Sequence, residues 1–158
     1  MLKNKITTLF TFILFTILIA CKSQEKNTLV ASTPSLFIKM QKTACYGTCP
    51  VYVVEIFSDG TVNFLGKQFV ENIGKYTSKL SADDISILKS KILTIDFFNL
   101  QDTYDSEITD FPSCITEVIL EGKTKKITNR HGGPAELKTL EKLIEEKVLK
   151  SNLIKSEQ

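Results

Sequence analysis

Two cysteines four positions apart are the most distinctive pair of reactive side chains in this sequence. Cys45 and Cys49 enclose Tyr-Gly-Thr and are followed by Pro50. In an extended strand their Cα atoms would lie roughly 13 Å apart, but a compact turn at Gly47 and Pro50 can bring them within the range of about 4.4–6.8 Å that a disulfide needs. In an exported protein the bond forms readily. The spacing therefore predicts a Cys45–Cys49 disulfide that closes a short loop and contributes about 2 kcal/mol at most.

Other uses of these thiols stay open. A dithiol beside a proline can exchange disulfides, although the spacing is not Cys-x-x-Cys and no βαβ pattern surrounds it. Cys45 and Cys49 could also join Cys114 and His131, the only histidine, in a tetrahedral zinc site, but the second pair lacks zinc-finger spacing. Cys114 could act as a nucleophile if His131 lay within hydrogen-bond reach. Because Cys114 begins an apolar strand pattern, we expect it to be a core residue, and we expect no metal and no cofactor.

A polar loop over residues 101–113 is a candidate partner-binding segment. Its acidic residues are Asp102, Asp105, Glu107 and Asp110. Calcium favours oxygen-rich loops, but this spacing is not that of an EF-hand, so we expect a solvated acidic loop. The residues that we expect to contact a partner are Tyr104, Thr109, Asp110 and Pro112.

Other motifs give little support for catalysis. The segment Arg130-His131-Gly132-Gly133 precedes a predicted helix whose free N–H groups could receive an anion, but it is short and matches no phosphate loop. The sequence contains no Gly-x-Ser-x-Gly, His-Glu-x-x-His or Walker motif.

The N-terminal segment is typical of a bacterial lipoprotein leader. Lys3 and Lys5 precede an uncharged apolar run over residues 6–20, which is shorter than the roughly 20 residues of a membrane-spanning helix. A retained signal anchor is the alternative. Leu18-Ile19-Ala20-Cys21 resembles a lipobox, although Ile19 is less usual than Ala or Ser. We therefore expect cleavage after residue 20 and lipidation of Cys21, whose acyl chains hold the protein on a membrane.

The predicted leader also determines which net charge and which location we expect for the mature chain. Removing residues 1–20 leaves 138 residues, with 18 basic and 18 acidic side chains, because the leader holds two lysines and no acid. A chain without net charge argues against binding nucleic acid. Lys22 follows the lipidated cysteine in place of aspartate. By analogy with lipoprotein sorting in Gram-negative bacteria, we expect the cell envelope, at the outer membrane, with the face left open.

Alternating apolar residues predict strands after a polar tether over residues 21–34, whose reach is about 20 Å. In the first strand Leu36, Ile38 and Met40 alternate with Phe37, Lys39 and Gln41. The expected strands are 36–41, 51–57, 61–65, 69–77 (interrupted near Gly74), 114–120 and 123–129. The pair Asp59-Gly60 predicts a hairpin turn with positive φ at both residues, and Glu121-Gly122 marks a second turn.

Two helices complete the pattern. The first begins at Ser81, which can cap the first turn with Asp84 as a capping-box partner, and its apolar face is Ile85, Leu88, Ile92 and Ile95. The second has Pro134 at its first position and an apolar face of Leu137, Leu140, Ile144 and Val148. The order ββββ-α-ββ-α predicts an α+β domain over residues 35–150, with a mainly antiparallel sheet, both helices on one face and a polar tail over residues 151–158.

Several segments together resemble an uncharacterised bacterial domain family, domain of unknown function 6438. They are Cys45–Tyr52, Asp59–Val62, Tyr104 with Thr109–Pro112, and Gly133–Leu137. The resemblance covers roughly residues 37–144, and its most specific part is Cys-x-Gly-x-Cys-Pro. It implies a lipoprotein or exported protein of Bacteroidetes-type bacteria. It implies no activity, substrate or catalytic residue.

We therefore expect a lipid-anchored cell-envelope protein that acts as a non-catalytic binding or interaction module. Its expected partners are the membrane, through acyl chains on Cys21, and an envelope protein. The alternative is a thiol- or metal-dependent envelope enzyme that uses Cys45, Cys49, Cys114 and His131.

Overall fold

The computed structural model describes residues 33–107 and 110–157. The predicted signal peptide over residues 1–20, the predicted lipidation residue Cys21 and nearly all of the predicted tether lie outside these residues. No helix in the described part of the chain is long and apolar enough to cross a membrane.

The first four strands follow one another as antiparallel neighbours. They are β1 (Leu36–Lys42), β2 (Val51–Phe57), β3 (Thr61–Gln68) and β4 (Gly74–Lys79). Buried and partly exposed side chains alternate along β2, with Tyr52, Val54 and Ile56 buried. This alternation confirms that one face of the sheet is packed while the other is not.

The second half of the domain adds two helices and four strands. These elements are α2 (Ala82–Thr94), the short helix η2 (Phe97–Asn99), β5 (Thr103–Tyr104), β6 (Cys114–Leu120), β7 (Lys123–Asn129), α3 (Ala135–Lys150) and β8 (Ile154–Lys155). In the part of the chain that is described, eight strands form one sheet in the order β5-β7-β6-β1-β2-β3-β4-β8. Every pair is antiparallel except β5–β7. The predicted α+β class and element order are confirmed, with β5 and β8 as additions.

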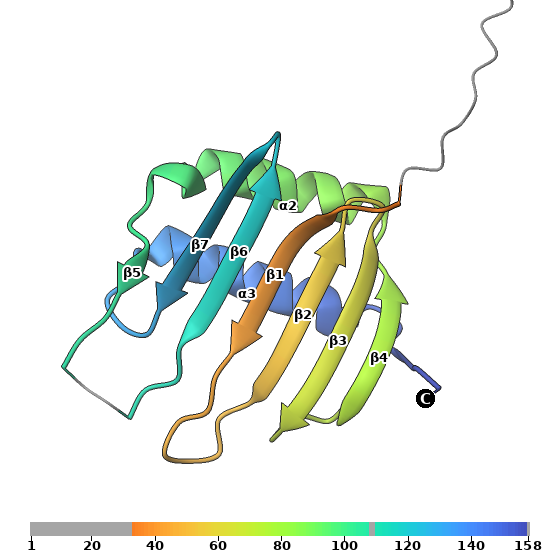
Figure 1. Ribbon diagram of the computed structural model, residues 1–158, viewed down its shortest axis with the longest axis horizontal. Coiled ribbons are helices and arrows are strands. Elements are labelled where there is room, and N and C mark those ends of the chain that lie inside the picture. Colours follow the sequence, from red (N-terminus) through yellow and green to blue (C-terminus); the bar gives the residue numbers. More distant parts are fainter. Residues whose placement is uncertain (1–32, 108–109, 158) are drawn as a thin grey trace, which may run out of the picture. The chain divides into compact units, whose positions relative to one another are not determined.

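Both long helices cover the same face of the sheet (Figure 1). Ile85, Leu88 and Ile92 of α2 are buried, as the apolar spacing predicts. On α3 the buried residues are Leu137, Leu140, Glu141, Ile144 and Val148. The predicted face is therefore confirmed, but it also contains the carboxyl group of Glu141.

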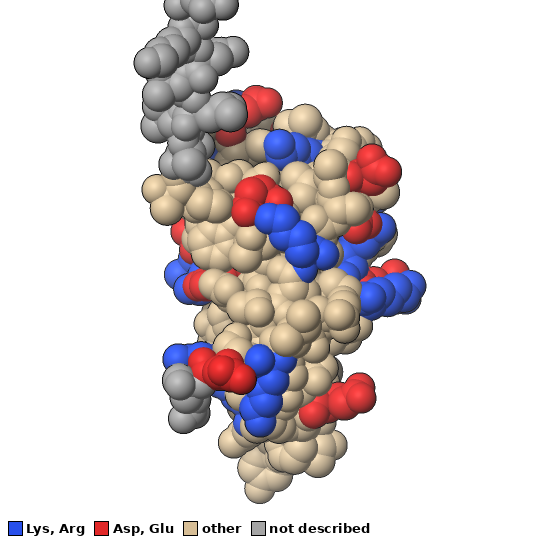
Figure 2. Space-filling model, turned by 90° about the vertical axis from the view of Figure 1, so that its right-hand side faces the viewer, with Lys and Arg blue, Asp and Glu red and all other residues tan. Residues whose placement is uncertain are grey.

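At the side of β4, basic and acidic residues are interspersed over the surface that Figure 2 shows.

The two hairpin turns differ in conformation. Glu121 and Gly122 both have positive φ, at 52° and 75°, as a two-residue type I′ turn requires. At the first hairpin only Gly60 has positive φ, so the prediction for Asp59 is wrong. Three residues, 58–60, connect these strands, and such loops need a single left-handed position next to the following strand. The Asp59 carboxylate instead accepts hydrogen bonds from the backbone and the hydroxyl of Thr61.

Two predicted boundaries and the predicted orientation of one side chain need correction. The strand predicted over residues 69–77 begins only at Gly74, because β3 continues to Gln68 and the chain turns at Phe69, where φ is 53°. The alternation predicts that Phe37 and Ile38 point to opposite faces of the sheet, but both are buried. A register shift in β1 turns the Phe37 ring toward α2, where Lys89 Nζ lies over it. Pro134 lies one residue before α3, at the N-cap position. The predicted capping box of Ser81 and Asp84 is confirmed.

Candidate functional site

Four polar or reactive side chains form one row across the end of the sheet. Tyr52, Lys42, Cys114 and Asn129 are direct partners on the adjacent strands β2, β1, β6 and β7. Directly paired residues point to the same face of a sheet. This face is the one that α3 covers, and Glu141 and Glu145, one helical turn apart, interact with the row from above.

Glu145 anchors one half of the row. Lys42 Nζ donates to both of its carboxylate oxygens, at 2.8 and 2.7 Å, and Tyr52 Oη donates at 2.6 Å. Burial alone would raise the pKa of the Glu145 carboxyl, but the hydrogen bonds from Lys42 and Tyr52 together hold that pKa below its usual range. Burial and the Glu145 carboxylate raise the pKa of the Tyr52 hydroxyl, so Tyr52 stays protonated. This half of the row is an ion pair in which each carboxylate oxygen has a donor.

Glu141 occupies the other half of the row, and its carboxylate has fewer hydrogen-bond donors than that of Glu145. Its side chain is only 8% exposed, and its hydrogen bonds come from Asn129 Nδ2, at 3.2 and 3.0 Å. Burial raises the pKa of the Glu141 carboxyl to about 7, against the opposing effects of Asn129, Cys114 and two lysines. Glu141 is therefore a buried group that gains or loses a proton near neutral pH.

Cys114 lies beside Glu141 as a buried free thiol. Burial, and next the nearby Glu141 charge, raise the pKa of this thiol to about 12. The thiolate is the nucleophilic form of cysteine, so Cys114 is inert at neutral pH. The prediction that it is a core residue is confirmed by its burial.

A pocket of about 290 Å³ opens at this end of the sheet, and we call it the strand-end pocket. It is bounded by the ends of β1 and β7, the start of β6, α3, and the loops before β2 and β6. Its lining residues are Lys42, Cys49, Pro50, Pro112, Ser113, Cys114, Asn129, Arg130, His131, Lys138 and Glu141. The structure thus brings three of the predicted reactive residues, Cys49, Cys114 and His131, to one cavity.

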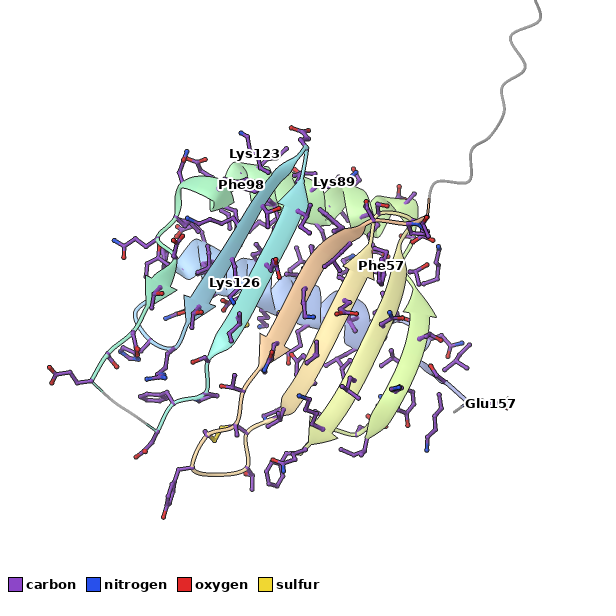
Figure 3. All side chains as sticks on the ribbon, in the orientation of Figure 1. Phe57, Lys89, Phe98, Lys123, Lys126 and Glu157 are labelled. Carbon is purple, nitrogen blue, oxygen red and sulfur yellow. A yellow bond between two sulfur atoms is a disulfide. The ribbon has the colours of Figure 1, made fainter. Side chains whose placement is uncertain are left out.

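The predicted disulfide between Cys45 and Cys49 is present, with Cα atoms 5.7 Å apart. It closes the loop between β1 and β2, where Figure 3 shows the sulfur–sulfur bond. Tyr46 in this loop is 95% exposed. The bond fixes one wall of the strand-end pocket, because Cys49 and Pro50 line it.

The disulfide bears directly on the zinc and thiol-enzyme alternatives. With Cys45 and Cys49 bonded to each other, neither supplies a thiolate to a metal or a substrate. Among the described residues no group of three or more His, Cys, Asp or Glu side chains is arranged to hold a metal ion. His131 is exposed and stacks on Phe111, with ring centroids 5.4 Å apart.

The predicted partner-binding loop is tied to the sheet rather than free. Tyr104 belongs to β5, and its hydroxyl accepts a hydrogen bond from the backbone N–H of Gln101. Asp102 pairs with Lys125 at 2.6 Å and Asp105 with Arg130 at 3.3 Å. Of the other predicted residues, Asp110 is exposed, Pro112 lines the strand-end pocket, and Thr109 lies outside the described residues.

The polar residues that define the site are not predicted from the sequence patterns. They are Lys42, Tyr52, Asn129, Glu141 and Glu145. A signal existed for two of them. Glu141 lies four residues after Leu137 and three before Ile144, so it shares their helical face. Lys42 continues the alternation of Ile38 and Met40. A charged residue at an apolar position of a pattern indicates a buried partner.

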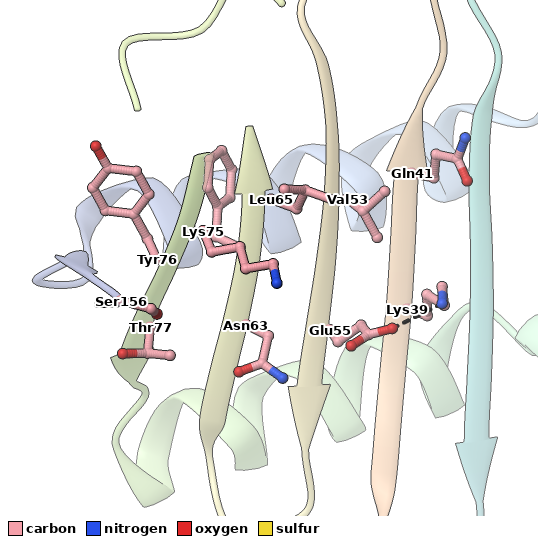
Figure 4. Close-up of a pocket in the computed structure, with 11 residues that line it drawn as sticks. Lys39, Gln41, Val53, Glu55, Asn63, Leu65, Lys75, Tyr76, Thr77 and Ser156 are labelled. Atoms are coloured by element: carbon pink, nitrogen blue, oxygen red, sulfur yellow. Dashed lines mark hydrogen bonds and ion pairs between the residues drawn. The ribbon is translucent and has the colours of Figure 1, made fainter. Parts of the chain in front are cut away.

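A second hollow, of about 530 Å³, lies on the sheet face that no described helix covers (Figure 4). Val53 and Leu65 contribute its apolar surface, and Lys39 pairs with Glu55 across β1 and β2 at 2.8 Å. We call it the open-face groove. It holds none of the reactive residues that the sequence singles out.

The fold and the site together define a small α+β domain with a one-sided helical cover and a disulfide-bounded polar pocket. The chain belongs to the domain of unknown function family DUF6438, whose model matches residues 36–148. The expected family is therefore confirmed. A comparison with curated proteins finds no match.

Removing the disulfide should have only a modest effect. In the double variant Cys45→Ser/Cys49→Ser we expect the free energy of unfolding to fall by about 2 kcal/mol at most, because the closed loop is short. Urea denaturation of the variant and the oxidised protein measures the difference. Cys114→Ser is the matched control for loss of a sulfur outside the loop. A loss well above 2 kcal/mol would mean that the loop carries contacts beyond its chain entropy.

Proposed function

We propose that this protein is a lipid-anchored protein of the cell envelope, held at the outer membrane by acyl chains on Cys21. Its domain acts as a non-catalytic binding module, and the strand-end pocket is its ligand site. The observation that carries the binding role is the composition of this pocket. It presents several hydrogen-bonding groups to one cavity, while neither cysteine of its lining is a reactive thiolate, since Cys49 is in a disulfide and Cys114 is a buried thiol.

The pocket also has the general features of a binding site. Ligand sites are concave and combine apolar walls with a few polar groups that fix orientation. Pro50 and Pro112 provide apolar walls, and Asn129 with Glu141 provides a buried polar floor. Several of these groups are held by other residues, for example Asn129 by Glu141. Such fixed groups keep the entropy cost of binding low.

The open-face groove supports the second expected partner, an envelope protein. It presents the partly exposed apolar side chains of Val53 and Leu65 between polar ones. A protein that adds a complementary surface would cover it without competing for the strand-end pocket.

The anchor is tested by the location of a Cys21→Ser variant. We expect wild-type protein in the membrane fraction and the variant in the soluble fraction, because the acyl chains supply the membrane affinity. Cys114→Ser is the control, and it should stay with the membrane. Metabolic labelling with a fatty acid should mark the wild type and Cys114→Ser but not Cys21→Ser. A variant that remains membrane-bound and labelled would refute the anchor.

The binding role is tested by a thermal-shift screen of small anions, cations and neutral compounds against the purified protein. A ligand that binds the native state raises the melting temperature. We expect at least one compound to stabilise the wild type and not Lys138→Glu, which reverses an exposed charge of the pocket. Lys142→Glu changes an exposed lysine of the same helix outside the pocket and is the control. Rapid alkylation of Cys114 in the native protein would instead favour the enzyme alternative.

A further inference from the structure

The strand-end pocket has a surplus of positive charge. Its lining includes Lys42, Arg130 and Lys138 but only one acid, Glu141. Lys42 is neutralised by Glu145, and Arg130 forms an ion pair with Asp105. Among the described residues Lys138 makes no ion pair, so one cation of the lining is uncompensated when Glu141 carries a proton. This balance favours a ligand with a single negative charge over a dianion.

A buried donor in the wall also lacks an acceptor. Arg130 Nε is shielded from solvent and has no hydrogen-bond partner among the described residues. A buried unsatisfied donor is costly. Arginine donors match the planar oxygens of a carboxylate. The missing partner is therefore an acceptor that the described residues do not supply.

The floor of the pocket contains the carboxyl group of Glu141, which can be protonated or ionised near neutral pH. Glu141 faces Cys114 on β6, Asn129 on β7, Lys42 on β1 and Tyr52 on β2, together with Lys138 on its own helix. Glu145 follows it by one turn on α3, and Arg130 and His131 belong to the same pocket wall. Because two adjacent negative charges repel each other, a second anion is tolerated beside Glu141 only when Glu141 carries a proton. The protonated carboxyl can then donate a hydrogen bond to it.

We propose that the strand-end pocket binds a small monocarboxylate, held by Lys138 and Arg130 at its wall and by the protonated carboxyl of Glu141 at its floor. The assignment rests on the proposed function of this pocket as a ligand site. A volume of about 290 Å³ lies at the lower limit of ligand pockets, so the ligand is a small molecule rather than a polymer. Binding takes up a proton, because the anion favours the neutral form of Glu141.

Isothermal titration calorimetry of the purified protein tests this proposal, with acetate, lactate and benzoate as probes. Their own pKa values lie below about 5, so only the protein titrates between pH 6 and pH 8. With a pKa of about 7, Glu141 is mostly protonated at pH 6 and mostly ionised at pH 8. We expect affinity for the best probe to fall about tenfold between these pH values. Inorganic phosphate is the comparison anion, and we expect it to bind more weakly.

Four variants locate the proton and the anion. Glu141→Gln keeps a neutral donor at both pH values and should bind with an affinity that changes less than twofold. His131→Asn should retain the tenfold pH effect, which separates the role of Glu141 from that of the histidine in the same pocket wall. Lys138→Ala should weaken binding about tenfold through loss of a charged partner, whereas Lys142→Ala should not. Circular dichroism confirms that each variant is folded.

The opposite results are equally specific. If no carboxylate binds the wild type at either pH, the ligand assignment is overturned. The binding module would still stand if the thermal-shift screen finds a different ligand that Lys138→Glu loses. Tighter binding of phosphate than of every carboxylate would overturn the monocarboxylate class. Loss of the pH effect in His131→Asn, or its persistence in Glu141→Gln, would overturn the role of Glu141.

Discussion

Replacing Lys42 with alanine should lower the free energy of unfolding by about 3 kcal/mol at pH 7. The substitution leaves the Glu145 carboxylate with only the Tyr52 hydroxyl as a partner. Both members of the pair are about three-quarters buried, with side-chain exposures of 28% and 24%. An unpaired charge in such a place typically costs about 3–5 kcal/mol, and the remaining exposure argues for the lower end. Urea denaturation measures the change.

Lys39→Ala is the matched control for this prediction. Lys39 also lies in β1 and also pairs with a glutamate, Glu55, at 2.8 Å. That pair is more exposed, on the open face of the sheet, so its loss should cost less than about 1 kcal/mol. Equal losses in the two variants would contradict the view that Glu145 depends on Lys42. Glu145→Gln in the Lys42→Ala background should recover part of the stability, because it removes the unpaired charge.

The second hairpin shows what the sequence determines locally. The bounds 114–120 and 123–129 are those of β6 and β7. Glu121 and Gly122 have the positive φ values that a two-residue turn needs. Buried residues recur at every second position, at Cys114, Thr116 and Val118 of β6 and at Ile127 and Asn129 of β7. Where the local signal is this consistent, the bounds of strand and turn can be predicted without knowledge of distant contacts.

The strands that the sequence did not predict depend on distant partners. β5 and β8 are two residues each, and no periodicity exists over two residues. β5 forms because Thr103 and Tyr104 pair with the edge strand β7. β8 forms because Ile154 and Lys155 pair with the edge strand β4. Such short edge strands are products of the assembled sheet, so their sequences alone carry no signal.

The site was predictable only in part for the same reason. Cys45 and Cys49 are close in sequence, and their spacing was sufficient to predict the bond. Lys42 and Glu145 are 103 positions apart. They meet because α3 packs over the face of the sheet to which Lys42 points. Pairing of β1 with β6 puts Cys114 directly opposite Lys42 on the same face. Sequence patterns predicted these strands but not the order in which they lie, so the polar row stayed hidden.

The largest pH-dependent effect is expected at Glu141. Its pKa rises from an ordinary value of 4.5 to about 7 in the folded protein, so the folded state binds a proton more tightly than the unfolded chain does. Stability must therefore fall as pH rises between these two values. The gap between them corresponds to about 3 kcal/mol at pH 8. Glu141→Gln lacks this titration and should exceed the wild type by about that amount at pH 8, while the two should be nearly equal at pH 4.

Urea denaturation of both proteins between pH 4 and pH 8 tests this prediction through the difference between them. The pKa values of Glu145 and Asp84 are lowered, so their stabilising contributions disappear as pH falls, but they affect both proteins alike and cancel. Glu136→Gln, an exposed position on the same helix, should follow the wild-type curve. A constant difference across this range would show that Glu141 does not change its charge there. Because the same proton is required for carboxylate binding, that result would also remove the basis for pH-dependent ligand affinity.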